Sequence, residues 1–446
     1  MIKRPRTIVA LTALVAASAM TLTGCAGGGS GSQGPDAKAP THLSGTISVW
    51  NYLSDREAKD FHSVVAGFTK ANPDVKVVFH DNQSDDQITK VISSGGDIDV
   101  AISSGADDIG AFCGSGAFRD LGPYMKRDNV SPAQFLAIPL AYSAFEGKQC
   151  SLPILSDTYG LYYNTALLSA AGYTEPPKTL SELEAMALKL TTYNADGSIK
   201  TLGFNPMMGF YENQAAQWSP STGATWMTGD KSTIAGSPAW TELMTWQKSF
   251  VDTIGYAKLK AFTSGLGDEF SANQAFQSGQ LAMNFDGEWR VAFIQSQKPD
   301  LKYGTAPFPV GDQHSSLYGG GYTAGDIIGI SKTSKNPEVA WALTNYLATN
   351  TEAIVKFANL LKNIPATKAA AASPDLEMTP QFKTFFDIAQ SPSVMSLPNT
   401  PIGTANQTVM EHYWEKYQSG SGGDLAAGLK KVDTDINNQI ALSAGN

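Results

Sequence analysis

The alternation of predicted strands and helices between residues 45 and 103 constrains the fold more than any other feature of this chain. Apolar residues alternate over 45–50, follow helical spacing over 61–68, alternate again over 75–79 and form a buried run over 97–103. A second, more polar helix fits before the last of these strands. Strand–helix–strand–helix–strand at this spacing favours βαβ units. We therefore expect an α/β fold with a parallel sheet.

Residues that follow these strands are candidates for a ligand site, because ligands of open α/β sheets bind beyond the carboxyl ends of the strands. Trp50 and Ser104 occupy such positions. A tryptophan at a strand end can equally belong to the core, and that alternative stays open for Trp50. The polar Asn51 and Tyr52 that follow it favour the ligand side.

Two helix starts have the Ser/Thr-x-x-Glu spacing of a capping box. Ser54 and Glu57 open the helix after the first strand, and Thr179 and Glu182 open another. In such a box each side chain accepts a hydrogen bond from the backbone N–H of the other residue. We expect helices to begin at both places.

A second ligand-side stretch lies near residue 280. Gly279 suits the left-handed turn after a helix, because glycine has no Cβ. A short buried strand is predicted over 281–285. Three candidates follow it, namely Asp286, Glu288 and Trp289. A tryptophan face beside charged hydrogen-bonding groups suits a sugar, which has apolar C–H faces and a rim of hydroxyls.

The segment 203–230 mixes aromatic residues with amides, hydroxyls and glycines. Packed cores rarely mix these types so evenly, whereas a carbohydrate cleft uses rings to stack on sugar faces and amides to bind hydroxyls. We therefore predict that at least one of Trp218 and Trp226 lies in the pocket. In the helix that follows, Trp240 and Trp246 are expected to be structural.

The N-terminus predicts export. Basic residues precede an apolar run over 7–22 that is too short and too alanine-rich for a good membrane span. The run ends in Leu-Thr-Gly-Cys, which resembles the lipobox of bacterial lipoproteins, where the cysteine is acylated. This predicts a signal peptide over 1–24, a lipid on Cys25 and a flexible linker over 25–42. A plain secretory signal with an incidental cysteine is the alternative.

Beyond the N-terminus, the cysteines are Cys113 and Cys150. An even pair in an exported protein favours a disulfide between them. The alternative is two buried thiols.

Two long motifs resemble those of a known family. The stretch 276–290 contains Phe-x-x-Gly-x-x-Ala-Met followed by Gly-x-Trp, and the stretch 151–183 contains a Pro-containing strand, Tyr-Asn and Pro-Pro-Lys-Thr-Leu-Ser-Glu-Leu. Both resemble the family 1 extracellular solute-binding proteins, the sugar-capturing components of ABC importers, among which are the maltose-binding proteins. Further matches follow in the family's order from about Gly45 to Ile440.

The resemblance implies a two-lobed periplasmic-binding-protein-like fold, with discontinuous α/β lobes joined by crossing hinge strands. Lobe one takes residues 43–155 and 305–347, and lobe two takes residues 156–304 and 348–446. The ligand binds between the lobes, closure about the hinge buries it, and the closed form is recognised by the ABC permease subunits. The protein is expected to be a monomer at the outer face of the cytoplasmic membrane, held there by its lipid alone.

The resemblance also implies further ligand contacts. Asp157 follows the predicted crossing strand, where the family often places an acidic or polar ligand contact, and Tyr159 comes from the second lobe. Gly320, Gly321 and Tyr322 lie on the glycine-rich segment that returns to lobe one, where glycine allows a close approach of backbone to ligand.

No pattern in the chain supports catalysis, a metal or a cofactor. The histidines lack metal-ligand spacing, and the motifs of hydrolase nucleophiles and zinc proteases are absent. Asp286 and Glu288 lie on one short turn, whereas glycoside hydrolysis needs carboxylates on opposite sides of the scissile bond. They are expected to accept hydrogen bonds from hydroxyls or to pair with Arg290. A net charge of −9 without a long basic run argues against nucleic acid.

Other ligands fit the same fold. A polyamine site needs several carboxylates around aromatic rings, and a ferric site needs adjacent tyrosines. The tryptophans among amides favour a carbohydrate, most simply a di- or oligosaccharide. A third alternative is a lipoprotein that binds a protein or polysaccharide at the cell surface without transport.

Overall fold

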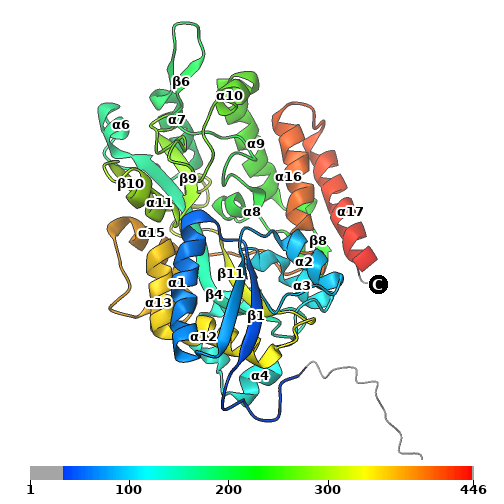
Figure 1. The fold of residues 1–446 in the computed structure, drawn as a ribbon. Coiled ribbons are helices and arrows are strands. Elements are labelled where there is room, and N and C mark those ends of the chain that lie inside the picture. Colours follow the sequence, from blue (N-terminus) through cyan, green and yellow to red (C-terminus); the bar gives the residue numbers. More distant parts are fainter. Residues whose placement is uncertain (1–33, 444–446) are drawn as a thin grey trace, which may run out of the picture. The chain divides into compact units, whose positions relative to one another are not determined.

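The computed structural model describes residues 34–443, which are built around a mixed β-sheet (Figure 1). The predicted signal peptide and Cys25 lie outside the described residues. The sheet contains β1 (Gly45–Asn51), β2 (Val75–His80), β3 (Val100–Ser103), β4 (Ser151–Asn164), β9 (Met283–Gly287), β10 (Tyr303–Ala306), β11 (Thr323–Ile330) and β12 (Ile364–Pro365). Short hairpins pair β5 (Thr192–Tyr193) with β6 (Ile199–Thr201) and β7 (Met227–Thr228) with β8 (Lys231–Ser232).

The predicted parallel arrangement is confirmed for the N-terminal strands. β1 lies between β2 and β3 and runs parallel to both. Ile47 and Val49 alternate into the core and are fully buried. β11 is antiparallel to β3, and β4 is antiparallel to β11, so the complete sheet is mixed.

β4 is the strand that joins the two parts of this sheet. Its residues 151–158 pair with β11 and β12, whereas its residues 159–164 pair with β9 and β10. The change of partners falls between Thr158 and Tyr159. Asp157 and Tyr159 therefore lie where the strand passes from one set of neighbours to the other.

Helices connect and flank the strands (Figure 1). They are α1 (Asp55–Ala71), α2 (Asp85–Ser93), α3 (Ile109–Gly114), α4 (Gly122–Arg127), α5 (Ala137–Tyr142), α6 (Thr165–Ala170), α7 (Leu180–Leu190), α8 (Ala215–Trp218), α9 (Pro238–Ile254), α10 (Tyr256–Thr263), α11 (Arg290–Gln297), α12 (Pro337–Thr349), α13 (Thr351–Leu361), α14 (Lys368–Ala371), α15 (Pro380–Ala389), α16 (Ala405–Gln418) and α17 (Leu425–Ser443). α13 packs against α1, and α16 packs against both α9 and α17.

One of the two predicted capping boxes is formed. At the start of α7, the Thr179 hydroxyl accepts from the N–H of Glu182, and the Glu182 carboxylate accepts from the N–H of Thr179, each at 3.2 Å. At the start of α1, Ser54 makes no side-chain capping bond. The prediction was wrong there because Glu57 pairs with Arg56 at 3.2 Å and lines a cavity instead of turning back to the helix end.

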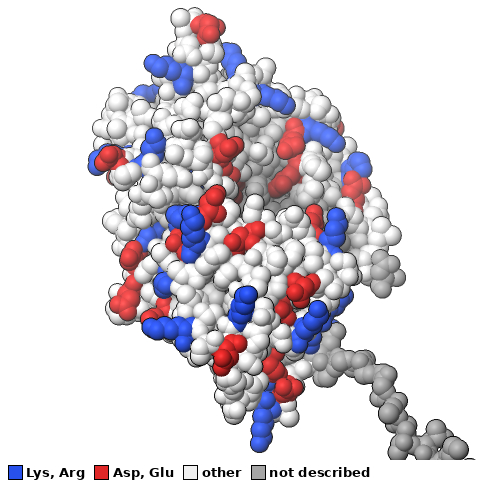
Figure 2. Space-filling view, in the orientation of Figure 1, with Lys and Arg blue, Asp and Glu red and all other residues white. Residues whose placement is uncertain are grey.

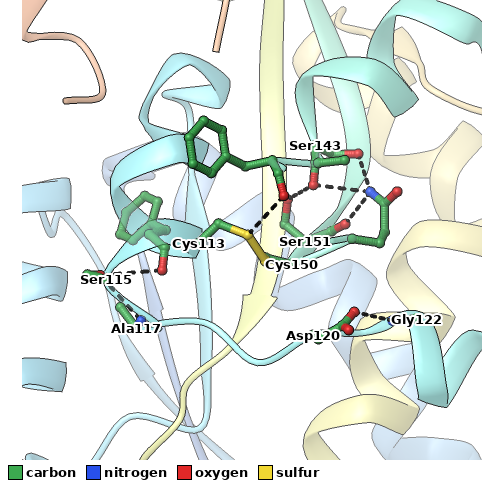
Figure 3. Close-up of a disulfide and its surroundings, with 12 residues drawn as sticks. Cys113, Ser115, Ala117, Asp120, Gly122, Ser143, Cys150 and Ser151 are labelled. Atoms are coloured by element: carbon green, nitrogen blue, oxygen red, sulfur yellow. Dashed lines mark hydrogen bonds between the residues drawn. A yellow bond between two sulfur atoms is a disulfide. The ribbon is translucent and has the colours of Figure 1, made fainter. Parts of the chain in front are cut away.

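Cys113 in α3 and Cys150, directly before β4, form a disulfide (Figure 3). Their Cα atoms are 5.6 Å apart, within the usual range for such a bond. In the chain-entropy account, a loop of this length contributes about 4 kcal/mol of stability. The bond ties α3 to the start of the strand that changes partners.

Within residues 34–443, no helix is long and apolar enough to cross a membrane. The same residues contain no group of three or more His, Cys, Asp and Glu side chains placed to hold a metal ion.

A candidate ligand-binding cleft

A cavity of about 840 Å³ opens at the carboxyl ends of the parallel strands. Tyr52 follows β1, Asn82 follows β2 and Ser104 follows β3, and all three line the cavity. The other lining residues come mainly from β4, β11, α1 and the segments 212–217, 270–297 and 404–411. In the space-filling view the surface is hollowed here, and acidic side chains stand around the hollow (Figure 2).

The structure brings several of the sequence-predicted residues together in this cavity. Its lining includes Ser104, Asp157, Tyr159, Trp289 and Tyr322. Gly320 and Gly321 line a separate void of about 10 Å³. A Cβ on Gly320 would lie 2.5 Å from the carbonyl oxygen of Ser393. This glycine therefore permits close packing of two backbone segments rather than the approach of a ligand.

The tryptophans predicted from the mixed aromatic segment lie in the core instead. Trp218 is fully buried and packs against Phe308, with ring centroids 5.4 Å apart. Trp226 is also buried and meets Trp240 edge to face at 4.9 Å. Gln217 does line the cavity. The amide next to Trp218 thus faces the cleft while the ring faces the core.

Trp50 also lies outside the cavity lining. Its ring stacks on His80 with centroids 4.7 Å apart, and its Nε1 donates to the Ser48 hydroxyl at 3.1 Å. These contacts place Trp50 in the packing of β1 against β2. The neighbouring aromatic residue, Tyr52, reaches the cavity, where its hydroxyl donates to Asp326 at 2.7 Å.

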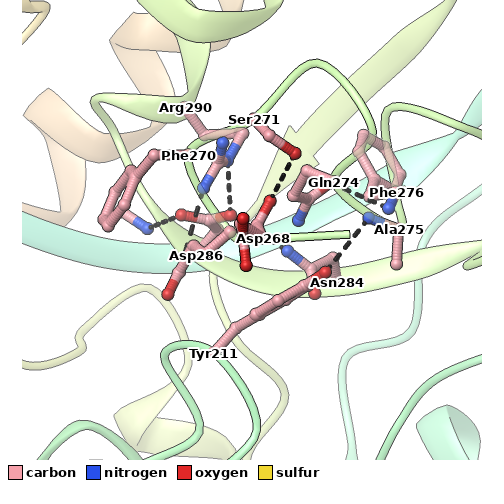
Figure 4. Close-up of polar contacts among 12 residues, drawn as sticks. Tyr211, Asp268, Phe270, Ser271, Gln274, Ala275, Phe276, Asn284, Asp286 and Arg290 are labelled. Atoms are coloured by element: carbon pink, nitrogen blue, oxygen red, sulfur yellow. Dashed lines mark hydrogen bonds and ion pairs between the residues drawn. The ribbon is translucent and has the colours of Figure 1, made fainter. Parts of the chain in front are cut away.

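Asp286 is fully buried and pairs with Arg290 rather than facing a ligand (Figure 4). It lies inside β9, one position further into the strand than predicted, and accepts from Arg290 Nε at 2.7 Å. The Arg290 guanidinium also lies 3.8 Å from the carboxylate of Glu269. Of the two expectations for Asp286, the pairing with Arg290 is the one found.

The same arginine contacts two rings of the cavity, Phe270 and Phe293, that were not predicted from the sequence. The guanidinium carbon of Arg290 lies 5.7 Å from the ring centre of Phe270 and 5.2 Å from that of Phe293, within cation–π range. Both rings line the cavity, and Phe270 is 54% exposed. The available signal was an aromatic residue in a glycine- and serine-rich loop directly before the 276–290 motif.

Glu288 is fully buried beneath the cavity. It accepts from the N–H of Thr158 at 2.7 Å and from the amide of Asn363 at 3.0 Å. The same amide donates to Asp157, which lines the cavity. Glu288 therefore positions β4 and Asn363 from below, and burial raises its pKa well above the ordinary value.

Trp289 is held in the cleft by its neighbours. Its ring meets that of Tyr159 edge to face at 5.3 Å. A Cβ on Gly287 would lie only 2.2 Å from the Trp289 ring, so the ring fits there because residue 287 is glycine. The Gly-x-Trp spacing of the motif thus sets where the indole lies.

Carboxyl groups dominate the charged lining of the cavity. They belong to Asp55, Glu57, Asp107, Asp157, Glu212 and Glu411, and Arg56 lies among them. Burial raises the pKa of Asp107 and Asp157 to about 6. It raises the pKa of Glu57 and Glu411 to about 7, although Arg56 opposes the rise at Glu57.

The chain is similar in sequence to proteins of one family. Residues 54–354 match the family described as bacterial extracellular solute-binding proteins. The maltotriose-binding protein of Pyrococcus abyssi is 24% identical over 398 residues, which cover 88% of this chain and 82% of the relative. The maltodextrin-binding protein MdxE of Bacillus subtilis is 25% identical over 426 residues, or 91% of each chain.

The solved structure of CpMnBP1 with mannotriose bound superposes with a TM-score of 0.79 at 23% identity, over 88% of this chain and 99% of the other. That likeness shows the two-lobed α/β fold expected from the sequence. Since the family match spans most of the chain, this protein belongs to the bacterial extracellular solute-binding proteins, as its sequence motifs predicted.

Proposed function

We propose that this protein captures a di- or oligosaccharide in its cleft and delivers it to an ABC permease. The observation that carries the proposal is the make-up of the cavity. The rings of Trp289, Tyr159 and Phe270 line the cavity together with amide and carboxyl groups. Sugars use both kinds of surface, because rings stack on C–H faces while polar groups bind hydroxyls. Relatives named for maltotriose and maltodextrin support the same ligand class.

Ligand capture would occur between two lobes that meet at β4. The exchange of strand partners between Thr158 and Tyr159 supports a boundary near the predicted position after residue 155. The second boundary is better drawn later than residue 347. α13 packs on α1, with the rings of Phe357 and Phe61 5.7 Å apart, and β12 pairs with the first part of β4. We therefore assign residues 348–371 to lobe one.

The lipid anchor is part of the same proposal. The family is extracellular, and the Leu-Thr-Gly-Cys sequence offers Cys25 for acylation. A Cys25→Ser variant is expected to leave the membrane fraction and appear in the medium or the soluble extract, as judged by immunoblotting of fractionated cells. Retention of the variant on the membrane would contradict the anchor. The relatives are solute-binding proteins, and we propose that this chain likewise binds its ligand without catalysis.

A thermal-shift screen of the purified protein tests the ligand class. The panel contains malto-, manno-, cello- and chito-oligosaccharides, together with spermidine, putrescine and ferric chelates. A ligand that binds only the folded state stabilises it by mass action, by about 2.7 kcal/mol at one hundred times its Kd. We expect one oligosaccharide series to raise the Tm by several degrees.

The matched control is Trp289→Ala, which removes a cavity ring while leaving the buried tryptophans in place. The same sugar should then shift the Tm much less. A response to polyamines or ferric chelates alone would be consistent with the fold but would contradict the proposal that the ligand is a sugar. Silence across the panel would favour a lipoprotein that binds a macromolecule at the surface without transport.

A further inference from the structure

We propose that the ligand of this cleft is an amino-sugar oligosaccharide, whose protonated amine is held by the carboxyl groups of the cavity. This inference rests on the proposed function, because it names the class of sugar that the same cleft takes. It is carried by the charge of the lining and by one buried carboxylate oxygen that lacks a hydrogen-bond donor.

The lining has six carboxyl groups and one guanidinium, that of Arg56. Arg56 already donates to Asp60 at 2.9 Å, to Glu57 at 3.2 Å and to the carbonyl oxygen of Leu360 at 3.0 Å. No lysine or histidine among the described residues lines the cavity. Apart from Glu57, the lining carboxyl groups have no ion-pair partner within the described part of the chain. A cation on the ligand would compensate the negative charge of these carboxyl groups when they are ionised.

Asp107 is the lining carboxyl group best prepared for such a cation. It is only 8% exposed. Its Oδ2 accepts from the Tyr322 hydroxyl at 2.5 Å and from Gln407 Nε2 at 3.0 Å. Its Oδ1 has no hydrogen-bond partner among the described residues. A buried acceptor left without a donor costs about 1–3 kcal/mol, and more for a charged group. A ligand that supplies this donor removes the cost and therefore binds more tightly.

A protonated amine fits both the negative charge of the lining and the unpaired Asp107 Oδ1 better than a neutral sugar does. A hydroxyl offers one donor and no charge, whereas an ammonium offers three donors and compensates the buried negative charge. A neutral ligand closed into this cavity would leave Asp107, Asp157 and Glu411 to keep protons or to remain as uncompensated charges. Nearby cationic charge favours their ionised forms, so amine binding is expected to release protons from the protein.

The remaining lining residues favour a sugar over a linear polyamine. Trp289 and Phe270 provide ring faces, and both also attract cations. Gln214 and Gln217 provide amides that suit ring hydroxyls, and the methylene chain of a polyamine offers no hydroxyl to bind them.

Calorimetric Kd values for matched ligands test the inference on the purified wild-type protein. One series compares the β-1,4-linked trimers of glucosamine, N-acetylglucosamine and glucose. The other compares acarbose, which carries a secondary amine, with maltotetraose, and spermidine is added alone. In at least one series the amine-bearing member should bind at least about tenfold more tightly than its neutral counterparts, the scale of one charge-assisted hydrogen bond.

Each other outcome contradicts a separate element of the account, namely the amine, the sugar or the proposed function. Equal or tighter binding of the neutral members, or binding of neutral sugars alone, would overturn the amine while keeping the proposed function. If spermidine binds and no sugar does, the ligand is cationic as proposed but is not a sugar. Failure of every sugar, including those of the wider screen, would overturn the proposed function as well.

Variants then locate the amine. Asp107→Asn should weaken the amine-bearing ligand about tenfold and change the affinity of its neutral counterpart little. Glu411→Gln provides a second test, because the Glu411 carboxylate accepts from the N–H of Ala215 and a glutamine oxygen can keep that contact. Asp230→Asn, in the exposed turn between β7 and β8, is the control with no expected effect. An amine preference that survives in both Asp107→Asn and Glu411→Gln would contradict the inference.

Discussion

Two groups of aromatic residues in this molecule are of similar residue types but differ in their surroundings. The buried aromatic cluster consists of Trp218, Trp240, Trp414 and Phe308, whose rings pack against one another. The aromatic rim consists of Trp289, Phe270 and Phe293 at the cavity. Both regions combine tryptophan and phenylalanine with amides and glycines, yet the cluster is closed to solvent and Phe270 is half exposed.

The difference lies in what each ring contacts from distant parts of the chain. Trp218 meets Trp414 from α16, nearly two hundred residues later in the sequence, and so becomes the centre of a core. Phe270 contacts a buried guanidinium on one side and stays open on the other. Composition alone does not separate these cases, because the partner that closes a ring against solvent is remote. The following predictions are ordered by expected size and test this contrast.

Trp218→Ala should destabilise the protein by about 3–5 kcal/mol, the usual cost of truncating a fully buried large aromatic residue. Urea unfolding followed by circular dichroism measures the loss. Ligand affinity of the fraction that stays folded should change little. A variant with nearly wild-type stability but no sugar binding would show that Trp218 belongs to the site.

Trp289→Ala should affect ligand affinity more than stability, the opposite of Trp218→Ala. We expect a loss of affinity for the sugar of about 1–3 kcal/mol, because a stacking face is removed, with a much smaller loss of stability. Calorimetry of the variant and of Trp289→Phe, which keeps a ring, separates stacking from packing. Unchanged affinity in Trp289→Ala would remove the aromatic rim from the binding site.

The acidic lining predicts how stability depends on pH in the absence of ligand. Burial raises the pKa of Asp107, Asp157, Glu57 and Glu411 to between about 6 and about 7. Carboxyl groups with raised folded-state pKa values contribute stability that is fully present below their unfolded pKa and is lost as the pH rises through the folded pKa. The Tm should therefore fall between pH 5 and pH 8.

Asp107→Asn should make that fall shallower, because one titrating group is removed. Asp128, whose pKa is lowered by its hydrogen bond with Arg127, contributes mainly below this pH range and should not mask the effect. A Tm that rises steadily from pH 5 to pH 8 would contradict the assignment of raised pKa values.

The smallest expected effect compares the two helix starts that share one sequence pattern. Thr179→Ala removes a formed capping box and should cost about 1 kcal/mol of stability. Ser54→Ala should cost clearly less, because the Ser54 side chain makes no capping bond. Equal losses in chemical denaturation would show that Ser54 caps α1 in solution.

Local patterns predicted much of the fold. Alternation and helical spacing are enough for β1, α1 and β2, because these elements follow one another in the chain and β1 pairs directly with β2. Gly279 has the expected positive φ of 77°, although the residues before it form turns rather than the expected end of a helix. The bounds of β4 and its exchange of partners do not follow from local patterns, because its antiparallel neighbours come from distant segments of the chain.

The site was harder to predict for the same physical reason. Tyr159, Trp289 and Tyr322 follow from motif position, and they line the cavity. Gln217 lines the cavity whereas the neighbouring Trp218 is buried, because the Trp218 ring packs on Trp246 of α9 and Trp414 of α16. Asp107 gave no signal in sequence, because its importance comes from an oxygen that the surrounding fold leaves without a donor.

A crystal structure of the protein with the tightest-binding oligosaccharide from the screen tests the account most directly. The account predicts sugar density in the cavity between the parallel strands and the segment 270–297, with one ring against Trp289 and a donor at Asp107 Oδ1. Sugar bound elsewhere on the molecule, with the cavity filled only by water, would contradict it.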